Sequence, residues 1–290
     1  SEMCIRDRGY TMVYGIAKML NFAHGDVIMV GAYVSFCATS YLGLPGWVSV
    51  ILSCVVCTVL GVLIEGLAYK PLRQAGPLAV LITAIGVSYL LQNLALLIYG
   101  SEQKAFPVLF TIPSVELGGV YIDGITIATM AVTAIIMVGL SLFINRTRMG
   151  KAMRAVSEDK EAAELMGISV NRVIAFTFII SGVLACISGN LVGMYYQTVD
   201  ITMGASIGMK TFASAILGGV GVLPGAMVGG LVIGVIETFA AGYISSGYRD
   251  AISFVVLILV LLIKPSGLFG SKQINKAVSY THLRAHETRH

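Results

Sequence analysis

Residues 145–172 read NRTRMGKAMRAVSEDKEAAELMGISVNR, a charged segment that separates two long apolar stretches of the chain. The apolar stretches on both sides suit membrane-spanning helices, which need about 20 predominantly apolar residues. The charged segment is therefore the part of the chain expected to meet water and other proteins. The fold prediction follows from this contrast between the segment and its flanks.

Within this segment a short helix is expected from Ser157 to Met166. Ser157 is a good N-cap residue, and Glu158 and Asp159 follow it in the first turn, where the positive end of the helix dipole favours acids. Gly167 stands where a C-terminal residue of left-handed conformation is wanted. A helix of about three turns is far too short to cross a bilayer.

The same helix carries the pattern Glu-Ala-Ala, followed after three residues by Gly. This pattern resembles the EAA loop of permease subunits in bacterial ABC importers, which docks on the ATPase subunit. Four side chains are small or soft enough to seat in a groove on another protein: Ala162, Ala163, Leu165 and Met166. The resemblance assigns the coupling role to Ser157, Glu161, Ala162, Ala163, Met166 and Gly167. The alternative is a solvated cytoplasmic loop with a chance triplet.

The composition places the chain in a membrane. Hydrophobic residues make up 57% of the 290 residues, charged residues only 12%, and the mean hydropathy is +0.87. The chain is thus roughly half as charged as a soluble domain, and a water-soluble fold cannot cover that much apolar surface. The net charge of +4 does not suggest nucleic acid as a partner. We predict an all-α fold, a polytopic bundle of transmembrane helices.

The bundle should contain about eight spans and a fragment of a first one. Apolar stretches of spanning length run through residues 25–43, 46–68, 78–99, 122–144, 173–196, 205–222, 225–244 and 250–264. Residues 9–20 form only part of a span, so we expect most of a first helix to be missing. Residues 9–277 then form a single transmembrane permease domain. The tails 1–8 and 278–290 look foreign, and we exclude both; a histidine-rich metal tail is the alternative for the second.

Basic residues orient the spans, because cytoplasmic loops carry an excess of Lys and Arg. Three regions are basic: residues 70–73, the charged segment 145–172 and residues 264–276. The connections 100–121, 197–204 and 245–250 hold only two basic residues and are predicted to be external. The cytoplasmic position of the charged segment thus follows without the Glu-Ala-Ala pattern.

Two places interrupt the apolar stretches and are candidates for a solute path. Residues 21–26 read NFAHGD. They form either a polar loop, with Asn21 and Asp26 capping adjacent helices, or a broken or re-entrant helix whose freed backbone groups and His24 face the path. Residues 217–221 read LGGVG, which predicts a broken or tightly packed helix. The candidate pathway residues are Asn21, Phe22, His24, Gly25, Gly218, Gly219 and Gly221.

Two ionisable residues, Lys210 and Glu237, fall inside apolar segments. Charged groups are costly in lipid and normally face the interior of a bundle, often paired with each other. We expect a structural ion pair between two helices. Direct contact with the solute is the alternative.

The sequence carries no pattern for catalysis, ATP binding or metal binding. Gly150-Lys151 is the only Gly-Lys pair, and it lacks both the first glycine and the hydroxyl residue of a P-loop. Cys54 and Cys57 have the spacing of a redox motif but lie within a span, where cysteine usually acts as a small hydrophobe. We expect no catalytic residue, no metal site and no cofactor bound by this chain.

Longer segments resemble one permease family. Residues 9–36, GYTMVYGIAKMLNFAHGDVIMVGAYVSF, look like the start of the branched-chain amino acid permease of high-affinity importers, the LivH-type subunit. Residues 148–168, 208–230 and 258–270 resemble that family in the same order, so the resemblance covers residues 9–270. Two departures stand out. The first helix is truncated, and the Ile-x-Leu-Pro that follows many EAA loops is absent, as is usual in this permease branch.

The resemblance implies a subunit that forms half of the membrane pathway of an ATP-driven importer for leucine, isoleucine and valine. It also implies a second homologous permease, two cytoplasmic ATPase subunits that bind ATP and Mg²⁺, and an extracytoplasmic solute-binding protein. The implied location is the bacterial cytoplasmic membrane. An importer for urea, short amides or sugars is an alternative. An ion-coupled secondary transporter, which belongs to a different class of protein, is a further alternative.

Overall fold

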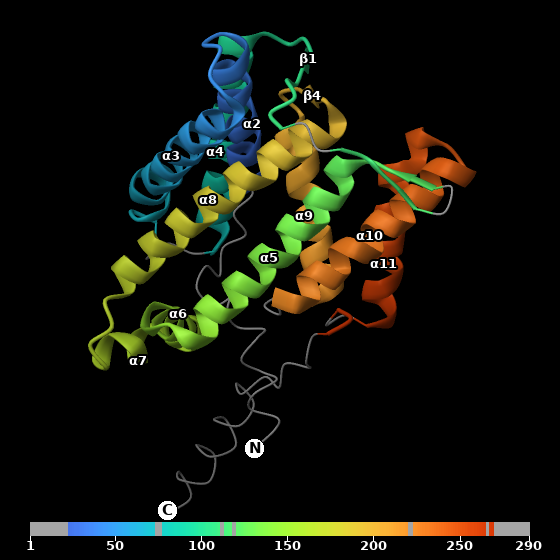
Figure 1. Cartoon of the computed structure of the whole chain (residues 1–290). Helices are drawn as coiled ribbons and strands as arrows, with labels where there is room; N and C mark the ends of the chain where they lie inside the picture. The colour runs from blue at the N-terminus through green and yellow to red at the C-terminus, as the bar shows by residue number, and fades with distance from the viewer. Residues whose placement is uncertain are drawn as a thin grey trace, which may run out of the picture.

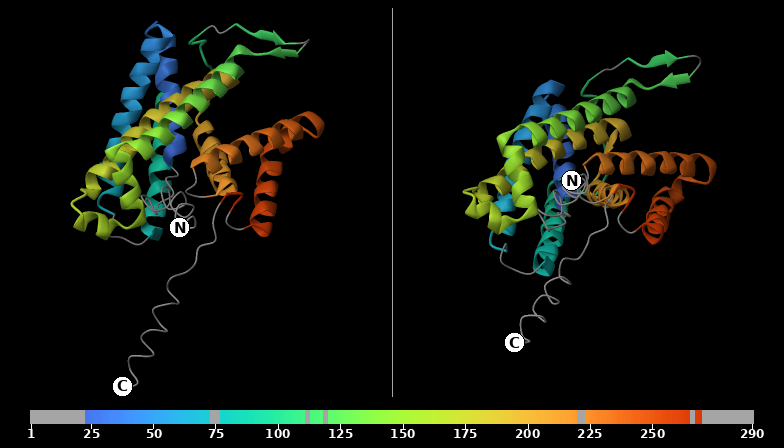
Figure 2. Two further views of the ribbon diagram at one scale, coloured as in Figure 1. Left: turned by 60° about the horizontal axis from the view of Figure 1, so that its bottom comes forward. Right: turned by 90° about the horizontal axis from the view of Figure 1, so that it is seen from below.

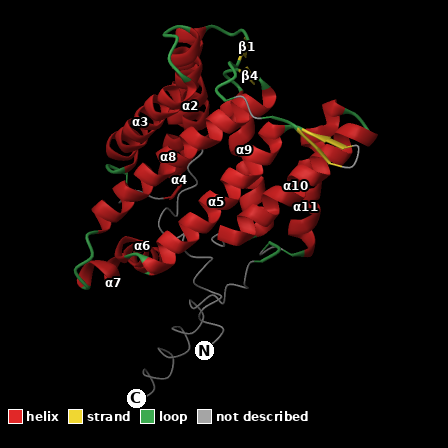
Figure 3. Cartoon of the chain, viewed as in Figure 1, coloured by secondary structure: helices red, strands yellow, loops and turns green. Residues whose placement is uncertain are grey.

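The computed structural model describes residues 23–72, 77–110, 113–117, 120–219, 223–264 and 267–269. Over these residues the fold is almost entirely helical, with four very short strands (Figure 3). The all-α prediction is confirmed. The tails 1–8 and 278–290, the fragment 9–20 and the pathway candidates Asn21, Phe22 and Gly221 lie outside the described residues.

Eight of the helices coincide with the eight predicted apolar stretches. They are α2 (Ala23–Ser40), α3 (Gly46–Ile64, continued by the π-helical turn η1, Glu65–Tyr69), α4 (Pro77–Tyr99), α5 (Gly124–Arg146), α8 (Val170–Tyr196), α9 (Met203–Gly218), α10 (Leu223–Tyr243) and α11 (Arg249–Ile263, preceded by the short turn η2, Ser246–Tyr248). Six of these eight are long and apolar enough to cross a membrane; α2 and α9 are the other two. Two further helices, α6 (Arg148–Glu158) and α7 (Lys160–Leu165), occupy the charged segment.

Helix α2 lies at the centre of the molecule. It packs against α3, α4 and α8 on one side of the molecule and against α9, which continues into α10 and α11, on the other (Figures 1 and 2). Most of its residues are buried, including Met29 and Tyr33. A helix that is apolar nearly all round is expected to be enclosed by other helices.

Glycines bring α2, α3 and α8 into close contact. A Cβ on Gly31 of α2 would lie 3.0 Å from the Cys57 sulfur of α3, and a Cβ on Gly182 of α8 would lie 2.7 Å from the Cys57 carbonyl oxygen. The Ser53 hydroxyl donates to the Gly31 carbonyl at 2.7 Å across the same interface. Small residues of this kind let helix backbones approach each other in a membrane, where packing and interhelical hydrogen bonds replace the hydrophobic drive.

The strands lie at one end of the helices. Strand β1 (Lys104–Ala105) pairs antiparallel with β4 (Thr198–Val199), which joins the chain after α4 to the chain after α8. A hairpin of β2 (Val115–Leu117) and β3 (Val120–Ile122) precedes α5. Helices α6 and α7 lie at the opposite end of the molecule (Figure 1). This is the arrangement that the predicted external and cytoplasmic connections require.

Candidate coupling helix and candidate pathway

The helix that carries the Glu-Ala-Ala pattern begins later and is shorter than predicted. α7 has six residues, and its N-cap is Asp159, whose carboxylate accepts from the backbone NH groups of Glu161 at 2.9 Å and Ala162 at 3.0 Å. Ser157 is not the cap. It is buried in α6, and its hydroxyl donates to the Arg154 carbonyl at 2.6 Å.

The correction has a local physical reason. Asp159 takes an extended conformation, φ −153°, and this breaks the charged segment into two helices. A carboxylate at an N-cap satisfies two free NH groups and also meets the positive end of the helix dipole. The serine hydroxyl instead bonds within its own helix, an alternative that serine commonly uses.

The end of α7 agrees with the prediction for Gly167. Its φ is +80°, the left-handed conformation that glycine adopts without steric cost. The Ile168 NH donates to the Ala163 carbonyl at 3.0 Å, and the Gly167 NH donates to the Glu164 carbonyl at 2.9 Å. These two bonds form a Schellman motif, so the short helix is fixed at both ends.

The faces of α7 have different environments. Ala163 is only 4% exposed and packs with residues of α6 and α8, among them Val156 and Val173. It is therefore unavailable to a partner's groove, contrary to prediction. Leu165 and Met166 are 90% and 83% exposed, and Glu161 and Ala162 are also exposed. We call the exposed pair Leu165 and Met166 the α7 tip.

The first candidate pathway segment lies in a continuous helix from Ala23 onward. The Nδ1 atom of His24 is 3.1 Å from the Ser181 hydroxyl of α8. Gly25 faces α9, where a Cβ would overlap the Gly204 carbonyl oxygen and lie 2.9 Å from the Cα of Gly208. Over the described residues there is thus no helix break at His24 and Gly25, and their environment is interhelical packing.

Asp26 was weighed only as a cap, and the structure gives it another environment. Its side chain is fully buried and accepts hydrogen bonds from two residues of α4, the Ser88 hydroxyl and the Gln92 amide, the latter at 3.0 Å. The signal was present in the sequence, since an acid inside an apolar stretch is normally paired or functional.

The second candidate segment is a packed helix end. α9 stops at Gly218, Gly219 has φ +103°, and both residues are buried. A Cβ on Gly218 would overlap the Gly225 backbone of α10. The NH groups of Leu268 and Phe269 donate to the last α9 carbonyls, at 2.8 and 3.1 Å. These contacts fit the predicted tight packing.

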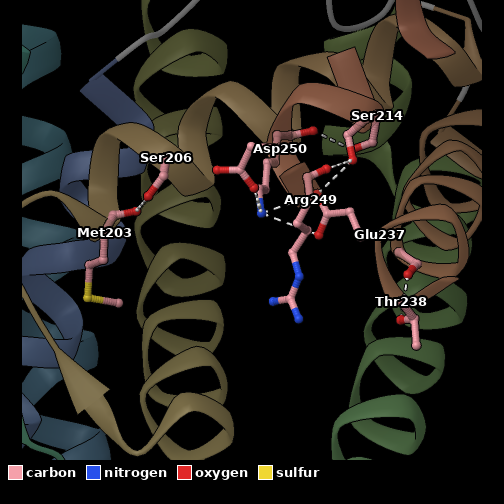
Figure 4. Close-up of polar contacts among 10 residues, drawn as sticks. Met203, Ser206, Ser214, Glu237, Thr238, Arg249 and Asp250 are labelled. Atoms are coloured by element: carbon pink, nitrogen blue, oxygen red, sulfur yellow. Dashed lines mark hydrogen bonds and ion pairs between the residues drawn. The ribbon is translucent and has the colours of Figure 1, made fainter. Parts of the chain in front are cut away.

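Lys210 and Glu237 lie together. The Lys210 Nζ atom of α9 is 3.2 Å from Glu237 Oε1 of α10 and 2.8 Å from Asp250 Oδ1 of α11. The Ser253 hydroxyl donates to the same Glu237 oxygen at 3.1 Å. Figure 4 shows Glu237 and Asp250 converging on one point between the helices. The Lys210 ammonium group therefore links α9, α10 and α11 through ion pairs.

Across the described part of the chain, no group of His, Cys, Asp and Glu is placed to hold a metal ion.

Comparison with known proteins identifies the family. Residues 8–261 match the family described as "Branched-chain amino acid transport system / permease component". The chain belongs to this permease family.

The relatives are similar over nearly their whole length. The high-affinity branched-chain amino acid transport system permease protein BraD of Pseudomonas aeruginosa is 43% identical, over 92% of this chain and 91% of its own. The corresponding LivH proteins of Salmonella typhimurium and Escherichia coli K12 are 42% identical over the same shares. No solved structure shows a significant match.

Family and structure together define the class of protein. The six apolar helices and the permease relatives make the chain a multi-pass protein of the bacterial inner membrane. Its family is a transport permease component.

Proposed function

We propose that this chain forms half of the membrane pathway of an ATP-driven importer for leucine, isoleucine and valine. The observation that carries the proposal is the α7 tip, an exposed apolar pair on a helix capped at both ends, in a chain of this permease family. An exposed apolar pair at a membrane protein's aqueous end favours contact with another protein.

Force would enter the bundle through α6, α7 and α8. Ala163 of α7 packs against α6 and against Val173 near the start of α8, so a displacement of α7 moves α8. α8 in turn packs along α3 and α2 at the centre of the molecule. A bound ATPase that pushes the α7 tip would therefore act on the central helix through rigid, closely packed elements.

The proposed complex contains partners at the cytoplasmic end, at the external end and beside this chain in the membrane. Two cytoplasmic ATPase subunits would dock at the α7 tips and hold the ATP and Mg²⁺. A second homologous permease would supply the other half of the pathway. A solute-binding protein would deliver the cargo at the end that carries β1 and β4. The relatives' names support the cargo, because they describe branched-chain amino acid transport permeases.

Uptake by the complex in vesicles tests the cargo. This chain, its paired permease and the ATPase subunits are reconstituted with the solute-binding protein, and uptake of radiolabelled leucine is measured with ATP. We expect isoleucine and valine to compete strongly and urea and ribose not to compete. Strong competition by urea or ribose, with little leucine uptake, would assign the complex to one of those cargoes instead.

A further inference from the structure

Helix α9 meets the rest of the molecule along a seam with α2. Apart from α10 and α11, α2 is the main neighbour of α9 among the described elements. The contact is built from glycines: Gly25 on α2 faces Gly204 and Gly208 on α9. Such a contact holds two backbones close without interlocking side chains. It is the boundary between the α9–α11 group and the group formed by α2–α4 and α8.

The Asp26 carboxylate lies directly beneath this seam. A Cβ on Gly204 would lie 2.7 Å from its Oδ1 atom, so α9 covers the carboxylate. From the other side Gln92 donates to Oδ1, and Ser88 donates to Oδ2. Both donors are uncharged, and no cation pairs with Asp26 among the described residues. By contrast, Lys210 is held by two acids.

We propose that Asp26 binds the α-ammonium group of the amino acid in the pathway, once α9 moves away from α2. This inference rests on the proposed function and names a recognition group within it. An amino acid crosses as a zwitterion, and its ammonium group needs an anion where water is excluded. A carboxylate held by two neutral donors, with no cation beside it among the described residues, is suited to that role.

The arrangement also explains why the carboxylate is buried at rest. With α9 closed over it, the two hydrogen bonds from α4 offset part of the cost of burying the group. Opening of the seam exposes one side of the carboxylate while Ser88 and Gln92 still orient it. The site is therefore presented only in the open state, which suits alternating access.

The test measures leucine transported for each ATP hydrolysed by the reconstituted complex. Asp26→Asn keeps the shape of the side chain and removes its charge. We expect leucine uptake to fall about tenfold or more, the size of effect expected for a hydrogen bond to a charged group. ATP hydrolysis stimulated by the solute-binding protein should stay within about twofold of wild type, because α7 is far from the change. Loss of both activities in proportion would overturn the proposal.

Two controls separate recognition from packing. Ser35→Ala removes a buried hydroxyl of α2 that donates to α3, and Ser53→Ala removes a buried hydroxyl of α3 that donates to α2. Both variants leave the Asp26 carboxylate and its two donors unchanged. Both should keep the wild-type ratio of leucine to ATP. If Ser35→Ala or Ser53→Ala reproduces the defect of Asp26→Asn, or if the Asp26→Asn complex does not assemble, the defect reflects helix packing and the proposal is wrong.

Uptake by the wild-type complex separates the ammonium site from the proposed function. Uptake of leucine by wild type, together with unchanged uptake by Asp26→Asn, would overturn the ammonium site and leave the proposed function standing. Failure of the wild-type complex to transport any branched-chain amino acid would overturn the proposed function itself.

Discussion

Lys210 forms ion pairs with two acidic residues from different helices. It is 27% exposed and touches Glu237, which is 13% exposed, and Asp250, which is 57% exposed. Glu237 is further held by the Ser253 hydroxyl. In the low dielectric of a helix bundle, removing one member of such a group leaves an uncompensated charge, which costs more than the group itself contributes.

This predicts an asymmetry between single and double variants. Lys210→Met should lower the free energy of unfolding by about 1–2 kcal/mol, less than for a fully buried pair because the lysine is partly exposed. Combining it with Glu237→Gln should recover most of the loss, since the amide oxygen still accepts from Ser253. Thermal unfolding of the purified proteins in detergent measures both. Equal destabilisation by the single and double variants would contradict this account. Asp250→Asn is the control, with little change expected.

At the scale of elements, the helix interfaces depend on a few glycines. Gly182 of α8 faces the backbone of α3, where an added Cβ would lie 2.7 Å from the Cys57 carbonyl oxygen and 2.8 Å from the Thr58 Cα. Backbone atoms cannot move aside as a flexible side chain does. A Cβ at Gly182 would therefore force α3 and α8 apart. Gly139 of α5 has nothing within 4 Å of an added Cβ.

The pair Gly182→Ala and Gly139→Ala isolates this effect. Gly182→Ala should destabilise the protein by about 1–3 kcal/mol, the usual cost of overpacking. Gly139→Ala should be neutral or stabilising by up to about 1 kcal/mol, because alanine is the better helix former. Melting temperatures in detergent provide the measurement. A Gly182→Ala protein as stable as Gly139→Ala would show that α3 and α8 are not held at this spacing.

The α7 tip is the element on which coupling depends. Combining Leu165→Ser with Met166→Ser should remove most ATPase binding, about tenfold or more in affinity, because two exposed apolar side chains supply the contact. Co-purification of the ATPase subunit measures it. Tyr121→Ser, which removes an exposed side chain from β3 at the other end, is the matched control. Undiminished ATPase binding by the double variant of the α7 tip would move the docking surface elsewhere.

How far the sequence predicted these elements depends on the kind of signal. The helices follow from apolar runs and their breaks, and Gly167 from the need for positive φ, because these signals are local. The cap at Asp159 was missed, since Ser157 and Asp159 are both good caps and the choice depends on how Ser157 packs in α6. The burial of Ala163 was missed because it depends on where α6 and α8 lie. The hydrogen bonds of Asp26 join residues more than 60 positions apart, which a helix pattern does not reveal.

At the scale of the whole molecule, two groups of helices meet at α2. Helices α3, α4 and α8 enclose it on one side, while α9 joins it to α10 and α11 (Figure 1). The α6–α7 pair lies at the end of α8, away from the seam. Under the proposed function, the energy for separating the two groups comes from the ATPase subunits and enters through α7.

The most direct test of this claim is leucine accumulation in sealed vesicles, with and without ATP. The account predicts concentrative uptake only when this chain is assembled with its partner permease, ATPase subunits and solute-binding protein, and only with ATP. Concentration of leucine by this chain alone, driven by an ion gradient without nucleotide, would contradict it.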